Sequence, residues 1–130
     1  MSRGDRPRPV PGSVREWSLW PLNTLTDGTA REFRAGDGNW PFRGFVVRWQ
    51  GEVYAYANTC PHAGHPLNLD PARFFAPGGE QLICRSHGAL FAPESGLCVQ
   101  GPCAGASLQA LPCRVVGGDI RVTVPAGHAD

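Results

Sequence analysis

Two short stretches of this sequence decide its interpretation, Cys60-Pro61-His62 and Cys84-Arg85-Ser86-His87. Each stretch supplies one thiol and one imidazole within a few residues. Both groups are common ligands of transition metals, and a thiolate favours the softer ions. Because the same pair of ligand types occurs twice, the sequence predicts one metal centre with four protein ligands.

Each stretch contains one cysteine and one histidine, and this pairing helps to distinguish between the candidate metals. In one kind of [2Fe–2S] centre, two cysteines hold one iron and two histidines hold the other. Structural zinc also accepts two cysteines and two histidines, but zinc fingers usually pair Cys with Cys and His with His. We therefore favour one [2Fe–2S] cluster bound by Cys60, His62, Cys84 and His87. Zinc stays open as the alternative.

The size and charge of the chain exclude several classes of protein. With 130 residues it is long enough for one domain with its own core and too short for a second catalytic unit. A net charge of +1 gives no indication of nucleic-acid binding. No stretch approaches the roughly 18–20 apolar residues that cross a bilayer, so we expect no membrane contact.

The N-terminal segment and the cysteine count bear on the compartment. Residues 1–15 are rich in proline, glycine and arginine, which predicts a disordered N-terminal arm. No apolar run follows this arm, so it does not match an export signal. Five cysteines is an odd number, which argues against a fully paired disulfide framework. We therefore expect a cytoplasmic protein, and separately we expect a monomer.

Short strands between turn residues predict an all-β domain over residues 16–125, followed by a loose tail over 126–130. The folded part is expected to begin with residues 17–25, and the predicted strands cover residues 30–34, 44–49, 52–58, 113–116 and 120–124. Gln50-Gly51 and Gly117-Gly118-Asp119 are typical of hairpin turns. Cys60 follows one predicted strand and Cys84 follows the short apolar run Leu82-Ile83, so two neighbouring loops could converge on one cluster. A single helical turn is expected near residues 70–74.

The two metal-binding stretches, Cys60-Pro-His-Ala-Gly and Cys84-Arg-Ser-His-Gly-Ala-Leu-Phe, resemble the Rieske ferredoxin family. Glu94-Ser-Gly and Gly101-Pro102 add to the resemblance, which extends over about residues 22–124. It implies a Rieske-type fold of three antiparallel sheets with a two-loop cluster-binding tip, within a subdomain of about residues 58–103. The loop at Gly101-Pro102 would cover a third side of the cluster.

Departures from the quinol-oxidising branch of that family narrow the resemblance. In that branch an extra cysteine in each ligand stretch forms a disulfide, and those positions here hold His65 and Ser86. In the same branch, two hydroxyl side chains donate hydrogen bonds to the cluster, and their positions in this sequence hold Ala89 and Phe91. Fewer hydrogen bonds imply a potential toward the low end of the roughly −150 to +300 mV Rieske range. The chain therefore resembles the oxygenase-type branch.

The resemblance implies an electron-transfer protein and not an enzyme. It would carry one electron from a reductase to a terminal oxygenase or a similar acceptor, docking through the tip around Arg85. A Rieske oxygenase needs a second iron held by two histidines and a carboxylate, and only His65 and His128 remain for it. Two alternatives stay open. The chain could be a small subunit of a larger oxidoreductase complex, or a structural or sensory metal-binding module without redox function.

Three cysteines lie outside the ligand stretches. Cys98 and Cys103 flank Gly101-Pro102, and we expect two free, partly buried thiols, with a labile disulfide as the alternative. Cys113 lies in a predicted strand and is expected to be a small apolar core residue.

Overall fold

Antiparallel strands make up nearly all the regular structure of the computed structural model, whose described residues are 7–13, 15–36, 41–61, 66–68, 73–84 and 88–125. The strands are β1 (Arg8–Pro9), β2 (Glu16–Pro21), β3 (Thr29–Ala35), β4 (Phe42–Trp49), β5 (Glu52–Ala57), β6 (Leu82–Ile83), β7 (Leu90–Phe91), β8 (Cys98–Gln100), β9 (Ala110–Leu111), β10 (Cys113–Val116) and β11 (Asp119–Thr123). A short 3-10 turn, η2 (Leu22–Thr24), follows β2. Within the described ranges, no helix has the length and apolar character that crossing a membrane requires.

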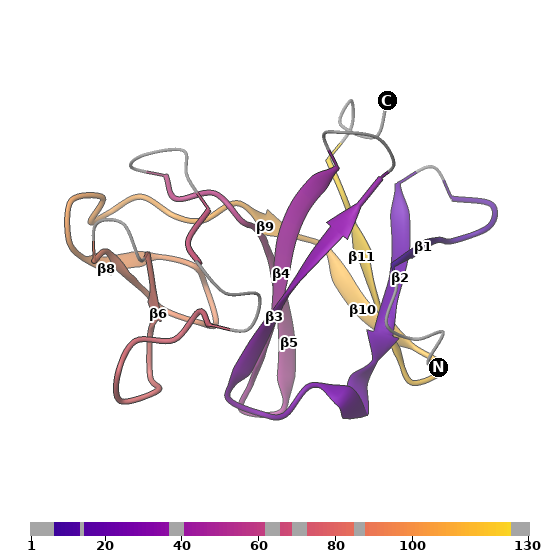
Figure 1. Ribbon diagram of the computed structural model, residues 1–130, viewed down its shortest axis with the longest axis horizontal. Coiled ribbons are helices and arrows are strands. Elements are labelled where there is room, and N and C mark those ends of the chain that lie inside the picture. Colours follow the sequence, from indigo (N-terminus) through magenta and orange to yellow (C-terminus); the bar gives the residue numbers. More distant parts are fainter. Residues whose placement is uncertain are drawn as a thin grey trace.

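The strands form three sheets, which confirms the expected all-β fold of antiparallel sheets. The outer sheet has the order β1-β2-β11-β10, the middle sheet β3-β4-β5-β9 and the small sheet β6-β7-β8. The middle sheet stands between the other two, with the outer sheet on its right and the small sheet on its left (Figure 1). The chain enters the small sheet after β5 and returns through β9, so residues 58–109 form an excursion from the middle sheet.

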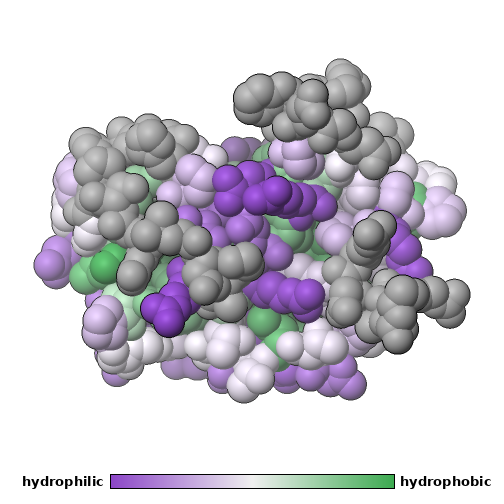
Figure 2. Space-filling model, in the orientation of Figure 1, coloured by the Kyte–Doolittle hydropathy of each residue, from purple (hydrophilic) through white to green (hydrophobic). Residues whose placement is uncertain are grey.

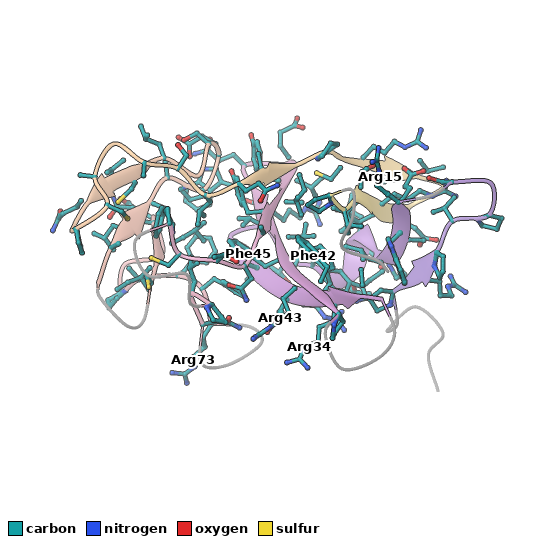
Figure 3. The ribbon with its side chains drawn as sticks, turned by 90° about the horizontal axis from the view of Figure 1, so that it is seen from above. Arg15, Arg34, Phe42, Arg43, Phe45 and Arg73 are labelled. Atoms are coloured by element: carbon teal, nitrogen blue, oxygen red, sulfur yellow. The ribbon has the colours of Figure 1, made fainter. Side chains whose placement is uncertain are left out.

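Strand β4 explains why the middle sheet has apolar neighbours on both faces. Successive side chains of a strand point to opposite faces. Phe42 and Val46 belong to one buried cluster, whereas Phe45 and Val47 belong to another. A strand buried on both faces needs a continuous apolar run, and Phe45-Val46-Val47 supplies it, each residue with an exposed fraction of 0%. Phe42 and Phe45 extend in different directions from the strand (Figure 3).

The two apolar clusters have different partners. The outer core contains Leu19, Trp20, Ile120 and Val122 from the outer sheet, packed with one face of the middle sheet. The inner core joins the other face to the excursion, and its described members include Phe45, Tyr56, Leu67, Phe74, Leu82, Cys60, Cys84, Phe91, Cys98 and Cys103. The inner core therefore holds the excursion against the middle sheet.

Aromatic packing joins the excursion to the middle sheet. Phe45 and Tyr56 are directly opposite each other on β4 and β5, with ring centroids 5.6 Å apart. Phe45 also stacks on Phe74 of the excursion at 4.3 Å. Truncating a buried aromatic side chain of this kind costs about 3–5 kcal/mol. This stack fixes the position of the excursion relative to the rigid β4–β5 hairpin.

Both hairpin predictions are confirmed. Gln50 and Gly51 connect β4 to β5 with φ angles of 52° and 85°, and positive φ at both central residues is the signature of the tight turn that suits twisted antiparallel strands. Gly117 and Gly118 connect β10 to β11 with φ angles of 59° and 87°. The second turn therefore has two residues and Asp119 already belongs to β11.

The described part of the N-terminal segment, residues 7–13 and 15, contains a strand where the sequence predicts a disordered arm over residues 1–15. Strand β1 pairs antiparallel with β2, placing Pro9 opposite Trp17. Two local hydrogen bonds close the turn between the strands: the Val10 amide donates to the Glu16 carbonyl at 2.9 Å, and the Glu16 amide donates to Ser13 Oγ at 3.1 Å. The sequence prediction missed this strand because an edge pairing needs no apolar pattern of its own.

Some predicted features are only half-confirmed or fall outside the described residues. Cys113 is half-buried and its thiol donates to the Val53 carbonyl at 3.5 Å, so it lies at the margin of the outer core. The predicted helical turn near residues 70–74 includes residues outside the described ranges, as does the predicted tail over 126–130.

Candidate metal centre

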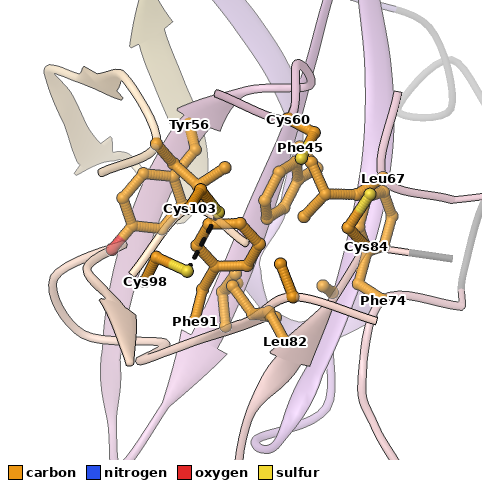
Figure 4. Packing of buried hydrophobic residues seen from close by; sticks show 14 residues of the cluster. Phe45, Tyr56, Cys60, Leu67, Phe74, Leu82, Cys84, Phe91, Cys98 and Cys103 are labelled. Carbon is orange, nitrogen blue, oxygen red and sulfur yellow. Dashed lines mark hydrogen bonds between the residues drawn. The ribbon is translucent and has the colours of Figure 1, made fainter. Parts of the chain in front are cut away.

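The structure brings the two predicted thiol ligands into the same apolar cluster. Cys60 lies three residues beyond the end of β5, and Cys84 directly follows β6. Both have an exposed fraction of 0%, and both belong to the inner core (Figure 4). The predicted imidazole ligands, His62 and His87, lie outside the described residues, as does Arg85 of the predicted docking tip.

Backbone hydrogen bonds close the second ligand loop at its base. The Cys84 amide donates to the Ala89 carbonyl at 2.9 Å, and the Gly88 amide donates to the Cys84 carbonyl at 2.8 Å. Strands β6 and β7 continue from this base as an antiparallel pair. These hydrogen bonds therefore join the described ends of the second ligand loop, Cys84 on one side and Gly88 and Ala89 on the other, at the start of the β6–β7 pair.

Two buried asparagines close the first ligand loop. Asn58 Nδ2 donates to Asn68 Oδ1 at 2.7 Å, and the Leu67 amide donates to Asn58 Oδ1 at 2.9 Å. Asn58 and Asn68 have exposed fractions of 2% and 8%. Since these residues come before and after Cys60 in the chain, their hydrogen bonds join the two ends of the loop that contains this ligand. We call this contact the asparagine brace.

A carboxylate of the middle sheet anchors the asparagine brace. Asn68 Nδ2 donates to Glu32 Oε1 at 3.0 Å, and Arg43 Nε donates to Glu32 Oε2 at 2.6 Å. Burial of Glu32 acts to raise its pKa, but the hydrogen bonds from Arg43 and Asn68 and the charges of Arg43 and Arg34 outweigh it. The pKa of Glu32 therefore lies below its ordinary value. An ionised Glu32 thus ties the first ligand loop to β3 and β4.

The loop at Gly101-Pro102 lies against the second ligand loop, in agreement with the position implied by the family resemblance. A Cβ atom at Gly101 would come within 2.8 Å of the Ala89 Cα atom, and the residue has a φ of 107°. Only glycine permits both this approach and this backbone conformation without strain. Ala89 and Phe91 have an exposed fraction of 0%, so the two positions that lack hydroxyl groups face the interior.

Cys98 and Cys103 lie next to each other beside Cys60. All five cysteines are among the described residues, and none forms a disulfide. The Cys103 thiol donates to Cys98 Sγ at 2.9 Å (Figure 4). Burial, the contact with Cys98 and the neighbouring Cys60 sulfur raise the pKa of Cys103 to about 12. Both residues are thus buried free thiols, as expected from the sequence.

Three arginine side chains lie on one side of the molecule. The side chains of Arg34, Arg43 and Arg73 extend toward the same side of the molecule (Figure 3). Arg34 is exposed over 62% of its side chain and Arg43 over 35%, although both approach Glu32. Arg73 is exposed and precedes Phe74 of the inner core. Figure 2 shows hydrophilic side chains gathered across the middle of one face of the molecule.

The sequence reasoning missed the supporting residues Asn58, Asn68 and Glu32. The two asparagines flank the first ligand stretch, and a pair of amides at such positions is a weak sign of a loop closed by side chains. Glu32 gave no sign, because an acidic residue in a predicted strand is usually solvent-exposed. Its role depends on β4 placing Arg43 beside it.

The donor chemistry of the described residues fits an iron–sulfur cluster. Two cysteine thiols from separate loops reach one apolar cluster, from which solvent is excluded. A thiolate is the obligatory protein ligand of such a cluster, and low solvent exposure helps to set its potential.

Comparisons with known proteins agree with this assignment. The family model of the Rieske [2Fe–2S] domain matches residues 19–116. The ferredoxin of carbazole 1,9a-dioxygenase from Nocardioides aromaticivorans IC177 is 27% identical, with a TM-score of 0.64 over 92% of this chain and 99% of that one. No curated protein matches the chain at the level of sequence.

Two further solved structures share the fold. A chain from a complex of reduced oxygenase and oxidised ferredoxin in carbazole 1,9a-dioxygenase is 21% identical, with a TM-score of 0.66 over 85% of this chain and 94% of that one. The terminal oxygenase of carbazole 1,9a-dioxygenase from Novosphingobium sp. KA1 is 17% identical, with a TM-score of 0.69 over 89% of this chain and 34% of that one. The family model spans most of the chain, and the buried thiol pair fits the cofactor that the model describes. The chain therefore belongs to the Rieske [2Fe–2S] domain family and binds one [2Fe–2S] cluster.

Proposed function

We propose that this protein is a cytoplasmic one-electron carrier that takes electrons from a reductase and passes them to a terminal oxygenase. Cys60, His62, Cys84 and His87 hold the cluster, two thiolates on one iron and two imidazoles on the other. The observation that carries the proposal is the burial of Cys60 and Cys84 in one core from two separate strand ends. When bound, the cluster supplies a reversible one-electron couple.

The carrier role agrees with the size and kinship of the chain. The Nocardioides ferredoxin is covered over 99% of its length, whereas the Novosphingobium oxygenase is covered over only 34%. The folded domain spans residues 16–125, with β1 added at its edge and the cluster-binding part at about residues 58–103. As a monomeric carrier it depends on partner proteins for both half-reactions.

The ligand assignment is tested by metal analysis of the purified protein. We expect iron and acid-labile sulfide in equal amounts, about two of each per chain. Cys60→Ser and Cys84→Ser should each lose the cluster and its visible absorption, because the thiolate ligands are required for binding. Cys113→Ser, at the margin of the outer core, is the matched control and should retain both. Stoichiometric zinc without sulfide would contradict the assignment.

The carrier function is tested with a reductase and an oxygenase in a rapid-mixing experiment. The protein should be reduced by the reductase and reoxidised by the oxygenase at rates that support turnover. A low midpoint potential, around −150 mV, is expected because Ala89 and Phe91 offer no hydroxyl hydrogen bonds to the cluster. The double variant Ala89→Ser and Phe91→Tyr should have a higher midpoint. Co-purification as a fixed subunit of one larger enzyme would favour the small-subunit alternative instead.

A further inference from the structure

The geometry of one surface loop places two thiols almost within bonding distance. Cys98 and Cys103 have their sulfur atoms 2.9 Å apart. A disulfide has an S–S distance of about 2.05 Å, so an approach of roughly 0.9 Å would close it. Neither cysteine is one of the four predicted cluster ligands. Cys98 Sγ otherwise contacts only the Gln100 carbonyl, at 3.4 Å, among the hydrogen bonds of the described residues.

The backbone around the two cysteines already has the form of a closed loop. The Cys98 amide donates to the Ala106 carbonyl at 2.8 Å, and the Gly105 amide donates to the Cys98 carbonyl at 3.2 Å. The Ala106 amide donates to the Cys103 carbonyl at 2.9 Å. The loop is therefore held in a compact form without a covalent link, and a disulfide would require little backbone movement. Residues 99–102 and 104–107 are exposed, whereas Cys98 and Cys103 have exposed fractions of 2% and 7%, so a reagent reaches the two sulfurs through a local opening of this loop.

We propose that Cys98 and Cys103 form a reversible disulfide, and that this disulfide lowers the potential of the neighbouring cluster. The oxidant is a low-molecular-weight disulfide, and the reductant that reverses the reaction is a thiol. The first half of the proposal rests on the geometry of the loop alone. The second half rests on the proposed function, because it concerns the cluster that Cys60 helps to hold.

The reaction balances as a thiol–disulfide exchange with glutathione disulfide. One cysteine thiolate attacks the glutathione disulfide and releases one glutathione, and the other then displaces the second. One S–S bond breaks in the reagent and one forms between Cys98 and Cys103. The two cysteine sulfurs together lose two electrons, which reduce the reagent, and the two thiol protons end on the two glutathione molecules. Burial favours the protonated thiols, so the exchange is slow at neutral pH.

The position of Cys103 connects the disulfide to the cluster. Its sulfur is close enough to Cys60 for the two thiols to interact. A Cys60 thiolate, as present when iron is bound, is a stronger acceptor than the neutral Cys98 thiol. The Cys103 thiol would then donate to the Cys60 sulfur, and hydrogen bonds to cluster sulfurs set the potential. Disulfide formation removes this hydrogen.

Peptide mapping provides the test of the disulfide. The cluster-loaded protein is incubated without oxygen in glutathione disulfide or in reduced glutathione, then acid-denatured and alkylated. Trypsin places Cys98, Cys103 and Cys113 on one peptide, residues 86–114, and puts Cys60 and Cys84 on two others. After oxidation we expect this peptide to carry one alkyl group in place of three. Dithiothreitol should restore all three.

Two variants and one potential measurement make the outcomes decisive. After oxidation the 86–114 peptide of Cys113→Ser should carry no alkyl group, because its two remaining cysteines form the disulfide. Cys98→Ser should not form an internal disulfide. Three alkyl groups on the wild-type peptide, or glutathione bound in place of an internal disulfide, would overturn the proposal whatever the state of the cluster. The oxidised wild type should also have a lower midpoint potential than the reduced wild type, and Cys98→Ser should show no such shift. An unchanged midpoint would overturn the link to the cluster.

Discussion

Replacing Asn58 by alanine is the sharpest test of how this fold holds its first ligand loop. The substitution removes two hydrogen bonds. Asn58 Nδ2 no longer donates to Asn68 Oδ1 at 2.7 Å, and the Leu67 amide no longer donates to Asn58 Oδ1 at 2.9 Å. Leu67 has an exposed fraction of 0%, so water cannot replace the lost acceptor. The loop that contains Cys60 would then lose the contact that joins its two ends.

The expected cost follows from the burial of these groups. Leaving one buried donor without a partner costs about 1–3 kcal/mol, and a lost hydrogen bond at a second site adds about 1 kcal/mol. We therefore expect Asn58→Ala to lower the free energy of unfolding by about 2–4 kcal/mol. At roughly 4 °C per kcal/mol for a domain of this size, the melting temperature should fall by about 8–16 °C.

The assay follows thermal melting by circular dichroism and cluster loss by visible absorption at one scan rate. A fixed rate is needed because cluster loss makes unfolding irreversible. The matched control is Asn23→Ala, an exposed asparagine of η2 with no side-chain hydrogen bond among the described residues, which should change stability by less than about 0.5 kcal/mol. The reasoning is refuted if Asn58→Ala has the same melting temperature as Asn23→Ala and loses its cluster no faster than the wild type.

Three further outcomes are expected from the contacts described above. Tyr56→Phe removes the hydrogen bond from Tyr56 Oη to the buried Pro93 carbonyl, 2.7 Å long, and should cost about 1–3 kcal/mol in a denaturant titration; an unchanged midpoint would contradict this. The pKa of Glu32 is lowered in the folded state from its ordinary value of 4.5, so its ionised form stabilises the fold at pH values above 4.5, and this stabilisation is lost as the pH falls through the folded value. The melting temperature of Glu32→Gln should therefore approach that of the wild type at low pH. A difference in melting temperature that does not change with pH would contradict a stabilising role of the ionised carboxylate. Arg73→Glu should slow electron transfer to an acidic partner at low salt more than at high salt, whereas Arg15→Glu, which lies at the other end of the molecule (Figure 3), should not.

Several parts of the fold could be predicted because their signals are local. A hairpin needs only a turn such as Gln50-Gly51 between two apolar runs, and both hairpins appear as expected. The two ligand stretches are equally local, since each metal-binding pair lies within a few residues. The departures at Ala89 and Phe91 could also be read from the sequence, because they concern residue type at a fixed spacing.

The sequence by itself determined the residue types of the site, the cofactor they suit and the strands that carry them. Only the tertiary structure decided which side chains meet. Phe42 and Phe45 occupy opposite faces of β4, but the pattern does not say which apolar cluster each joins. The asparagine brace, its anchor Glu32 and the contact of Cys98 with Cys103 depend on where distant segments return, and loop closure over such distances leaves no mark in a local pattern.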